Sequence, residues 1–490
     1  MLALYLITVV FVGWLVYRLH LDPLSHIPGP FLAKFIPICN IRMIHTGRVV
    51  FTFKKLHDTY GPVVRIGPSE LSFATVTAFD SIYGFEGDKN FTIYGSRRGV
   101  VSNASGTDES LGNSACKQSR RKLRPLVTST LNELMASSAE RYCHLALTEQ
   151  LAAHRVGQTG STPMSLSTLN YRYLWQLANM VAFGNRGQEA HRESFNPHIR
   201  WPNPFVYFID LLFIFYSRAT IHRHARTVFK VWQAIRFVCG QTTQSPQVDF
   251  IDDDSAFPDN LRRRLRQAAD KAGLHDVSDF TLLINSMILR FSVYGTSDHM
   301  INAVFYYLLQ NSQCLERLEE EVLSVGVSDE ELSDNRLAKL PYLNACINET
   351  FRMAPAFNGG ILQRVSCGAT VDGVYVPPGV AVTVDMFTLG HSKQYWENPD
   401  AFCPERWLES SGKDVFKASR PFLIGARQCP GRQMAYQMFR VLIARLVYLY
   451  SIELVNKDFN IERDTFCGIH WADLQVDVIM KPRMPDVLGY

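Results

Sequence analysis

Hydrophobic and polar positions follow helical spacing over most of the chain. Between about residues 115 and 310 the pattern is mostly helical. Polar loops interrupt it near 155–165, 185–204 and 240–260. Residues 280–311 form one long apolar stretch, but Arg290 and Asp298 in its middle make it too polar for a membrane span. We therefore expect a long core helix there, followed by an exposed helix over residues 312–325.

Two stretches have the shorter period of β-strands. Residues 63–73, VVRIGPSELSF, place two β-rich runs around Gly-Pro-Ser, which predicts a hairpin. Residues 370–385, TVDGVYVPPGVAVTVD, predict a strand, a turn and a second strand. No linker rich in Gly, Ser or Pro, no charge block and no repeat divides the chain. The pattern therefore predicts one large domain that is mainly α with small β-sheets.

Only the N-terminal segment departs from the pattern of a soluble domain. Residues 2–17 carry no charge, and Arg18 follows at once. These 16 residues are slightly short of the roughly 20 that span a bilayer. A span extended to Leu21, with Arg18 and His20 snorkelling toward the surface, comes close to that length. We expect a transmembrane anchor over residues 1–21, and the positive charge after it predicts that the remaining chain faces the cytosol.

A cleaved signal peptide is the alternative interpretation of this segment. It would need a basic region before the apolar run and a small-residue cleavage site after it, and the sequence shows neither. The prolines and glycine of HIPGP cannot continue a helix, so residues 22–30 are expected to form a stiff hinge. Residues 31–490 then make up the main domain.

Composition and charge narrow the function classes. The chain of 490 residues is 47% hydrophobic and 20% charged, which is ordinary for a globular protein. Fifty basic and 46 acidic residues give a net charge of +4, which is too small to indicate nucleic-acid binding. The ten cysteines have no paired spacing, so we expect reduced thiols in a cytosol-facing protein.

One of these cysteines stands in a loop with candidate chemistry, PFLIGARQCPGRQMA at residues 421–435. Cys429 is followed by Pro430-Gly431 and then by apolar residues at helical spacing. A thiol just ahead of a helix N-terminus lies in a positive field that favours the thiolate, the form that binds metals. Arg427 adds to that field. The alternative interpretation is a buried cysteine that acts as a small hydrophobic side chain.

Two further motifs precede this loop. Glu349 and Arg352 in NETFR lie three residues apart on a predicted helix, so they share a face and can pair. Arg406 follows in the loop sequence FCPERW. Alone, a Glu/Arg pair of this spacing is most often a surface salt bridge that contributes little to stability. In this order and spacing, the three motifs together are a much stronger signal than any one of them alone.

In that combination the chain resembles the cytochrome P-450 superfamily of haem-thiolate enzymes along nearly its whole length. The fixed positions of the family's haem-binding loop match Phe422, Gly425, Arg427, Cys429 and Gly431. Glu349 and Arg352 match its Glu-x-x-Arg motif, and Arg406 matches the arginine that completes that network. The anchor, the hinge and the PERW sequence look most like microsomal members from filamentous fungi that tailor secondary metabolites.

The resemblance implies the cytochrome P-450 fold, with haem b held between the long central helix and the helix after Cys429. The thiolate of Cys429 is then the axial ligand of the haem iron. The resemblance also implies three arginines that bind the haem propionates, namely Arg120, Arg364 and Arg427. For Arg120 and Arg364 the alternative interpretation is surface charge.

Smaller roles are implied for the other matched residues. Phe422 packs beside the iron ligand, Gly425 permits a tight turn, and Gly431 lets the backbone approach the sulfur. The Glu-x-x-Arg pair and Arg406 form a buried ion network that is structural and holds the cysteine loop in place.

The central helix departs from the family pattern. The family's acid-Thr-Thr segment aligns with Gly295, Thr296 and Ser297, so a glycine replaces the acid. Thr296 is then the expected catalytic hydroxyl on the oxygen side of the haem. Asp298 compensates for the acid only if a π-bulge or slip turns it toward Thr296; otherwise the Thr296 hydroxyl bonds its own helix backbone. On the early helix, Cys116 stands where the family usually has Trp or His.

The resemblance implies a membrane-bound haem monooxygenase of the endoplasmic reticulum. It would use O₂ and two electrons from NADPH, delivered by a separate NADPH–cytochrome reductase, with cytochrome b5 as a further candidate donor. The sequence has no G-x-x-x-x-G-K-[ST] motif and no G-x-G-x-x-G motif between a strand and a helix, which indicates that the chain has no nucleotide domain of its own.

The substrate is expected to be a lipophilic small molecule, because the segments implied to line its pocket are apolar and aromatic. These segments are residues 91–114, 291–297, 356–362 and 466–471. His299 and His470 have no partner at metal-ligand spacing, so we expect local structural roles for them. Two alternative functions stay open. One is a haem-thiolate enzyme that catalyses rearrangement, coupling or dehydration, as the missing acid suggests, and the other is a haem-binding membrane protein without catalysis.

Overall fold

The structure is a computed structural model. It describes residues 2–37, 47–93, 117–155, 163–184, 259–274, 279–325, 332–357, 362–408, 414–467 and 471–483. The chain packs into two compact units, of which one combines residues 1–94, 131–178 and 291–490, and the other combines 95–130 and 179–290.

The described chain begins with helix α1 (Leu2–Val16), which continues as a short π-helix, η1 (Tyr17–Leu21). Helix α1 has no charged side chain, and large apolar residues such as Val10 and Phe11 are exposed on it. None of the described helices is both long enough and apolar enough to cross a membrane.

The main sheet has five strands in the order β1-β2-β8-β5-β3. These strands are β1 (Val63–Gly67), β2 (Glu70–Phe73), β8 (Ala381–Val384), β5 (Arg364–Ser366) and β3 (Phe91–Ile93). β1 and β2 pair antiparallel, which confirms the hairpin predicted over residues 63–73. β8 runs parallel to β2, whereas β5 runs antiparallel to both β8 and β3. Leu71 and Val382 lie in one buried cluster with Phe79 of helix α4 (Val76–Tyr83).

Three smaller sheets are present in the described residues. They are the pair β6 (Ala369–Val371) and β7 (Val374–Val376), the set β4 (Met164–Ser165), β12 (Asp477–Pro482) and β9 (Tyr450–Leu454), and the pair β10 (Phe466–Cys467) and β11 (Trp471–Ala472). Residues 370–385 therefore contain three strands, not the two predicted. The reason is that Asp372-Gly373 and Pro377-Pro378-Gly379 both turn the chain, and the second turn leads into β8 of the main sheet.

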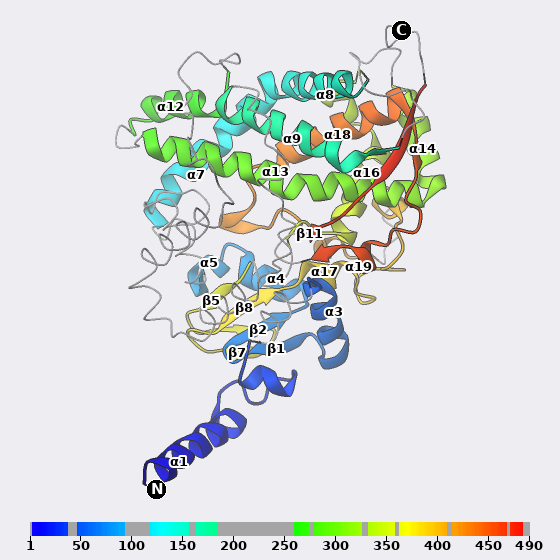
Figure 1. Ribbon diagram of the computed structural model, residues 1–490. Coiled ribbons are helices and arrows are strands. Elements are labelled where there is room, and N and C mark those ends of the chain that lie inside the picture. The colour runs from blue at the N-terminus through cyan, green and yellow to red at the C-terminus, as the bar shows by residue number, and fades with distance from the viewer. Residues whose placement is uncertain are drawn as a thin grey trace. The chain divides into compact units, whose positions relative to one another are not determined.

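Helices make up most of the described chain. Helix α13 (Asp279–Gln310) is unbroken over 32 residues, which confirms the long helix predicted over 280–311 (Figure 1). Helix α14 (Ser312–Leu323) follows it, largely exposed as predicted. Helix α18 (Arg432–Leu449) buries most of its side chains and contacts α14, α8 (Glu140–Arg155) and α16 (Pro341–Met353).

Eight further helices complete the described part of the chain. They are α3 (Val49–Tyr60), α5 (Gly87–Asn90), α7 (Lys117–Leu134), α9 (Leu166–Phe183), α12 (Leu261–Lys271), α15 (Asp334–Leu337), α17 (Met386–Gly390) and α19 (Ile461–Asp464). Four short 3₁₀ segments are η2 (Phe31–Lys34), η5 (Pro404–Trp407), η6 (Phe416–Ala418) and η7 (Gly425–Arg427), and a π-helical segment, η3 (Met135–Ala139), joins α7 to α8.

Candidate functional site

The predicted cysteine loop connects η6 to α18 and ends at the N-terminus of that helix. The backbone N–H of Cys429 donates to the carbonyl oxygen of Phe422 at 2.8 Å. The Cys429 side chain is exposed, so the interpretation as a buried hydrophobic side chain does not hold. Cys143, by contrast, is a buried cysteine, and its burial raises the pKa of its thiol to about 12. Cys429 is thus an accessible thiol just before a helix N-terminus, whose field favours the charged form.

Different structural features explain why glycine stands at each of the two matched positions of this loop. Gly425 has a φ of +70°, and a Cβ there would lie 2.6 Å from the carbonyl oxygen of Tyr83. It therefore permits the predicted tight turn and also lets the loop touch the backbone after α4. Gly431 has an ordinary φ of −86°, and a Cβ there would lie 3.8 Å from Sγ of Cys429, a normal contact distance. Close approach to the sulfur does not explain Gly431; its missing side chain keeps the space beside the thiol open.

Phe422 links the cysteine loop to α16. Its ring centroid lies 5.1 Å from that of Phe351, edge-on, and 5.5 Å from that of Tyr436 on α18. The Tyr436 hydroxyl donates to the side-chain oxygen of Asn348 at 2.6 Å. Both α16 residues stand next to members of the Glu-x-x-Arg motif, so aromatic packing couples the loop to that helix.

The structure brings Glu349, Arg352 and Arg406 together in a buried ion network. Oε1 of Glu349 accepts hydrogen bonds from Nη2 of Arg352 at 2.7 Å and from Nε of Arg406 at 3.1 Å. Oε2 accepts from Nε of Arg352 and from the indole N–H of Trp407, both at 2.9 Å. Arg406 also pairs with Asp414 at 2.7 Å. Because each carboxylate oxygen has at least two donors, the network offsets the cost of burying these charges.

The same network joins α16 to the segment around η5. Arg352 donates through Nη1 to the carbonyl oxygen of Pro399 at 2.6 Å. Oε1 of Glu349 also accepts from the backbone N–H of Cys403 at 2.9 Å. The ring of Trp396 lies 5.2 Å from Cζ of Arg352, a cation–π contact. The side chains therefore tie the backbone that precedes the cysteine loop to α16.

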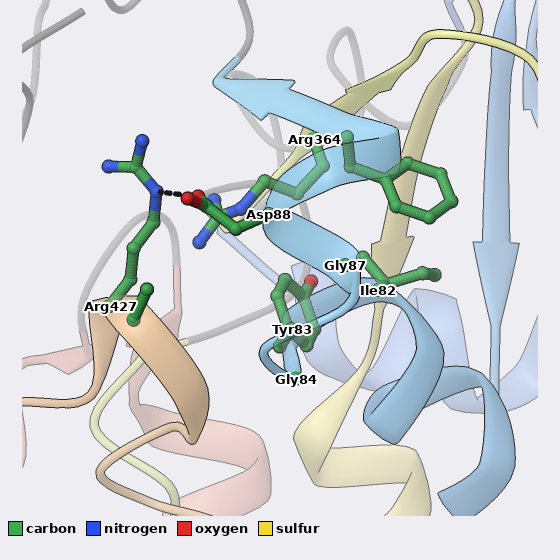
Figure 2. Close-up of a pocket in the computed structure, with 9 residues that line it drawn as sticks. Ile82, Tyr83, Gly84, Gly87, Asp88, Arg364 and Arg427 are labelled. Atoms are coloured by element: carbon green, nitrogen blue, oxygen red, sulfur yellow. Dashed lines mark ion pairs between the residues drawn. The ribbon is translucent and has the colours of Figure 1, made fainter. Parts of the chain in front are cut away.

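Two of the three predicted propionate-binding arginines line one small pocket (Figure 2). Arg427 pairs through Nε with Oδ1 of Asp88 at 3.4 Å. Arg364 is only 8% exposed, and its guanidinium lies over the Tyr83 ring at 5.2 Å. Surface charge therefore does not describe Arg364. The side chain of Arg120, on α7, lies outside the described residues.

Helix α13 has no bulge at Thr296. It is α-helical throughout, and the Thr296 hydroxyl donates to the carbonyl oxygen of Ser292 at 2.7 Å. Oδ1 of Asp298 accepts from Asn302 at 3.3 Å, and Oδ1 of Asn302 accepts from Asn170 at 2.7 Å. Residues two apart on an α-helix point about 200° apart. The bulge that would let Asp298 replace the missing acid is therefore absent, and Thr296 makes the backbone bond of the alternative interpretation.

His299 has the local structural role expected for it. Its ring stacks on Trp471 with centroids 5.0 Å apart, and its Nε2 lies 3.3 Å from the carbonyl oxygen of Ala354. The indole N–H of Trp471 donates to the carbonyl oxygen of Pro355 at 3.0 Å. These contacts bring the central helix together with Trp471, the last residue of one expected pocket segment, and with the two residues that precede another, 356–362.

Other predicted positions cannot be placed, because they fall outside the described residues. They are Cys116, residues 94–114, residues 358–361 and residues 468–470, which include His470.

Comparison with known proteins agrees with the geometry of this site. Residues 28–477 match the family described as cytochrome P450. This chain belongs to the cytochrome P450 family. It is 87% identical over 490 residues to cytochrome P450 monooxygenase bfoB of Aspergillus brasiliensis, covering 100% of both chains. It is 63% identical over 479 residues to cytochrome P450 monooxygenase aunB of Aspergillus niger, covering 98% of this chain and 100% of that protein. With cytochrome P450 monooxygenase FUP2 of Fusarium proliferatum the identity is 31% over 491 residues, covering 98% and 96%.

The residues of this chain fit the haem that its family carries. The Cys429 thiol is accessible, and Gly431 leaves the space beside it open. Arg427 and Arg364 offer guanidinium donors in one pocket, which suits a carboxylate. Among the described residues, no group of three or more His, Cys, Asp or Glu side chains offers a different metal site. Cys429 would thus hold the iron, and the two arginines a haem carboxylate.

Sequence reasoning missed three residues of this site, Asp88, Trp407 and Asp414. Trp407 directly follows Arg406 in PERW, and this adjacency is the signal that points to it. Asp88 and Asp414 belong to no motif. Only tertiary packing brings them to Arg427 and Arg406.

Proposed function

We propose that this protein is a membrane-anchored haem-thiolate monooxygenase that tailors a lipophilic small molecule in fungal secondary metabolism. The observation that carries the proposal is the exposed Cys429 thiol ahead of α18, with Arg427 and Arg364 in one pocket. Three fungal relatives that bear the name monooxygenase support it. Haem bound through a thiolate supplies the activation of O₂, because the thiolate donates electron density to the iron.

The electrons are proposed to come from NADPH through a separate NADPH–cytochrome reductase, with cytochrome b5 as a second donor. The support is the sequence, which has no phosphate-cradling loop of either nucleotide-binding type. The role of this chain is then to hold the haem, orient the substrate and guide protons. Thr296 is the side chain proposed to guide a proton, once its hydroxyl leaves the carbonyl of Ser292.

A second candidate function is rearrangement, coupling or dehydration by the same haem-thiolate centre. Two observations favour it. Gly295 replaces the acid that the family uses beside the threonine, and the Thr296 hydroxyl donates to its own helix. A rearrangement or dehydration that activates no O₂ needs no proton delivered to oxygen and tolerates both features, whereas an oxidative coupling still consumes NADPH and O₂.

The test is turnover with NADPH–cytochrome reductase, using the compound that accumulates when the gene is deleted. Product formation is expected to require both NADPH and O₂. Thr296→Ala is expected to lower the product rate by roughly 10²-fold, the lower end for a positioned proton donor, and to raise the hydrogen peroxide formed per NADPH consumed. Thr296→Ser keeps the hydroxyl and is the matched control, with coupling close to wild type.

Each contrary result identifies another function. Turnover without NADPH or O₂ indicates an isomerase or dehydratase. If Thr296→Ala forms as much product per NADPH consumed as wild type does, the proposal that Thr296 guides a proton is wrong. Product analysis then distinguishes a reaction that joins two substrate molecules from one that inserts oxygen. A protein that binds haem but consumes no NADPH with any redox partner is a non-catalytic carrier.

Residues 1–21 are proposed to anchor the protein in the endoplasmic reticulum membrane by a single pass, with the catalytic domain facing the cytosol. Exposed apolar side chains on α1 support this, as does the positive charge of Arg18 after them. At the end of this segment, Oδ2 of Asp22 lies 2.8 Å from Nη1 of Arg18 and 2.7 Å from Nη2 of Arg65. The Arg65 backbone N–H donates to the carbonyl oxygen of Pro28 at 2.8 Å, which ties the hinge to β1.

Deleting residues 1–21 is expected to move the protein from the carbonate-washed membrane fraction to the supernatant, with haem still incorporated. Deleting Asp22 as well removes a carboxylate from Arg65, whose side chain is buried. That longer truncation is expected to lose about 3–5 kcal/mol of stability, the usual cost of leaving a buried charge without its partner, measured by urea unfolding. If the shorter truncation stays in the washed membranes, the anchor has been assigned to the wrong segment.

A further inference from the structure

A carboxylate stands in the pocket that the two haem-carboxylate arginines line. Asp88, on α5, lies 3.4 Å from Nε of Arg427 through its Oδ1. Both side chains are largely withdrawn from solvent, with 22% of Asp88 and 15% of Arg427 exposed. Figure 2 shows the Asp88 carboxylate and the guanidinium groups of Arg427 and Arg364 around the same pocket. No motif recognised in the sequence includes Asp88.

The backbone on both sides holds this pair in place. A Cβ at Gly87 would collide with the carbonyl oxygen of Ile82, so the turn before Asp88 packs tightly on the end of α4. The carbonyl oxygen of Asn90, two residues later, accepts from the backbone N–H of Cys367 at 2.8 Å. The cysteine loop meets the same turn, since Gly425 lies against the backbone of residues 83–85. Asp88 and Arg427 are thus carried by two segments in direct backbone contact.

Arg427 has five N–H donors, and Asp88 lies at the Nε position. In Figure 2 the two terminal nitrogens of Arg427 point away from Asp88. Arg364 adds a second cation to the pocket, so the three side chains sum to one positive charge. One further carboxylate would neutralise them.

We propose that Asp88 is a positioning residue of the haem-carboxylate pocket. It holds Arg427 by Nε, so that the terminal nitrogens of that guanidinium are presented to a haem carboxylate. Its negative charge also favours the oxidised state of the bound haem, which lowers the reduction potential. The inference rests on the haem-thiolate function proposed above.

The test compares purified haem-loaded wild type with Asp88→Ala, Asp88→Asn and a control. Glu86→Gln is the matched control, because Glu86 lies two residues earlier, is 78% exposed and pairs with Lys89 at 2.8 Å. Two quantities are measured, the rate of haem transfer to excess apomyoglobin and the midpoint reduction potential. Asp88→Ala is expected to lose haem about 10-fold faster, as for other outer-shell partners of a bound metal centre. Both Asp88 variants are expected to have a higher potential than wild type, whereas Glu86→Gln matches wild type in both measurements.

Two results would overturn the role of Asp88. In one, Asp88→Ala retains haem at the wild-type rate and potential, so that the ion pair has no effect on the cofactor. In the other, Asp88→Ala retains haem longer, so that Asp88 competes with the haem carboxylate. Either result with a thiolate-ligated spectrum in wild type rejects the role of Asp88 and leaves the haem-thiolate function standing. Wild type without that spectrum rejects both.

Discussion

Replacing Cys429 with alanine is expected to abolish the red-shifted Soret band that reduced, thiolate-ligated haem shows with carbon monoxide. Cys429 is exposed ahead of α18, with the space beside its sulfur left open by Gly431. The thiolate is the form that binds metals, and the helix N-terminus favours it. Alanine has no ligand atom, so haem either leaves the protein or is bound without thiolate. The measurement is the difference spectrum of the reduced protein with and without carbon monoxide.

The control for this experiment is Cys367→Ala. Cys367 is also exposed, but it lies between β5 and β6 and precedes no helix. Its variant is expected to keep the wild-type spectrum, which shows that the loss in Cys429→Ala comes from the position of the thiol and not from its exposure. An unchanged spectrum in Cys429→Ala would remove the basis of the haem-thiolate assignment.

Replacing Glu349 with glutamine is expected to destabilise the protein by about 3–5 kcal/mol and to lower haem incorporation sharply. Removing one partner of a buried ion pair leaves the remaining charge without compensation, and Glu349 is the carboxylate paired with Arg352, whereas Arg406 keeps Asp414. Glutamine keeps the shape but directs an NH₂ group at donors that need an acceptor. The backbone N–H of Cys403 and the indole of Trp407 lose their charged acceptor as well. Urea unfolding and the ratio of haem to protein are the measurements.

Glu453→Gln is the matched control for the Glu349 variant. Glu453 pairs with Lys481 at 2.7 Å, but more than half of each side chain is exposed. Solvent screens such a pair, so its loss is expected to cost less than about 1 kcal/mol. If the two variants have the same urea midpoint, the buried network is not what holds this part of the chain.

Local features of the fold could be predicted from the sequence because they depend on neighbours along the chain. The length of α13 follows from sustained apolar periodicity, and the hairpin of β1 and β2 follows from a turn between two β-rich runs. The prediction for 370–385 was incomplete, because both Asp372-Gly373 and Pro377-Pro378-Gly379 can turn a chain. Pairing decided between them, since β7 joins β6 whereas β8 joins the main sheet.

Spacing within a few residues is enough to show which thiol precedes a helix and that Glu349 and Arg352 share a helical face. The contact between Asp88 and Arg427 could be found only in the folded chain, because hundreds of residues separate them and no local sequence pattern links them. The tertiary structure also decided between the two interpretations of Thr296, since an unbroken α13 leaves its hydroxyl on the carbonyl of Ser292. Spacing specifies which side chains can share a face, whereas packing between distant segments selects the partners that each of them contacts.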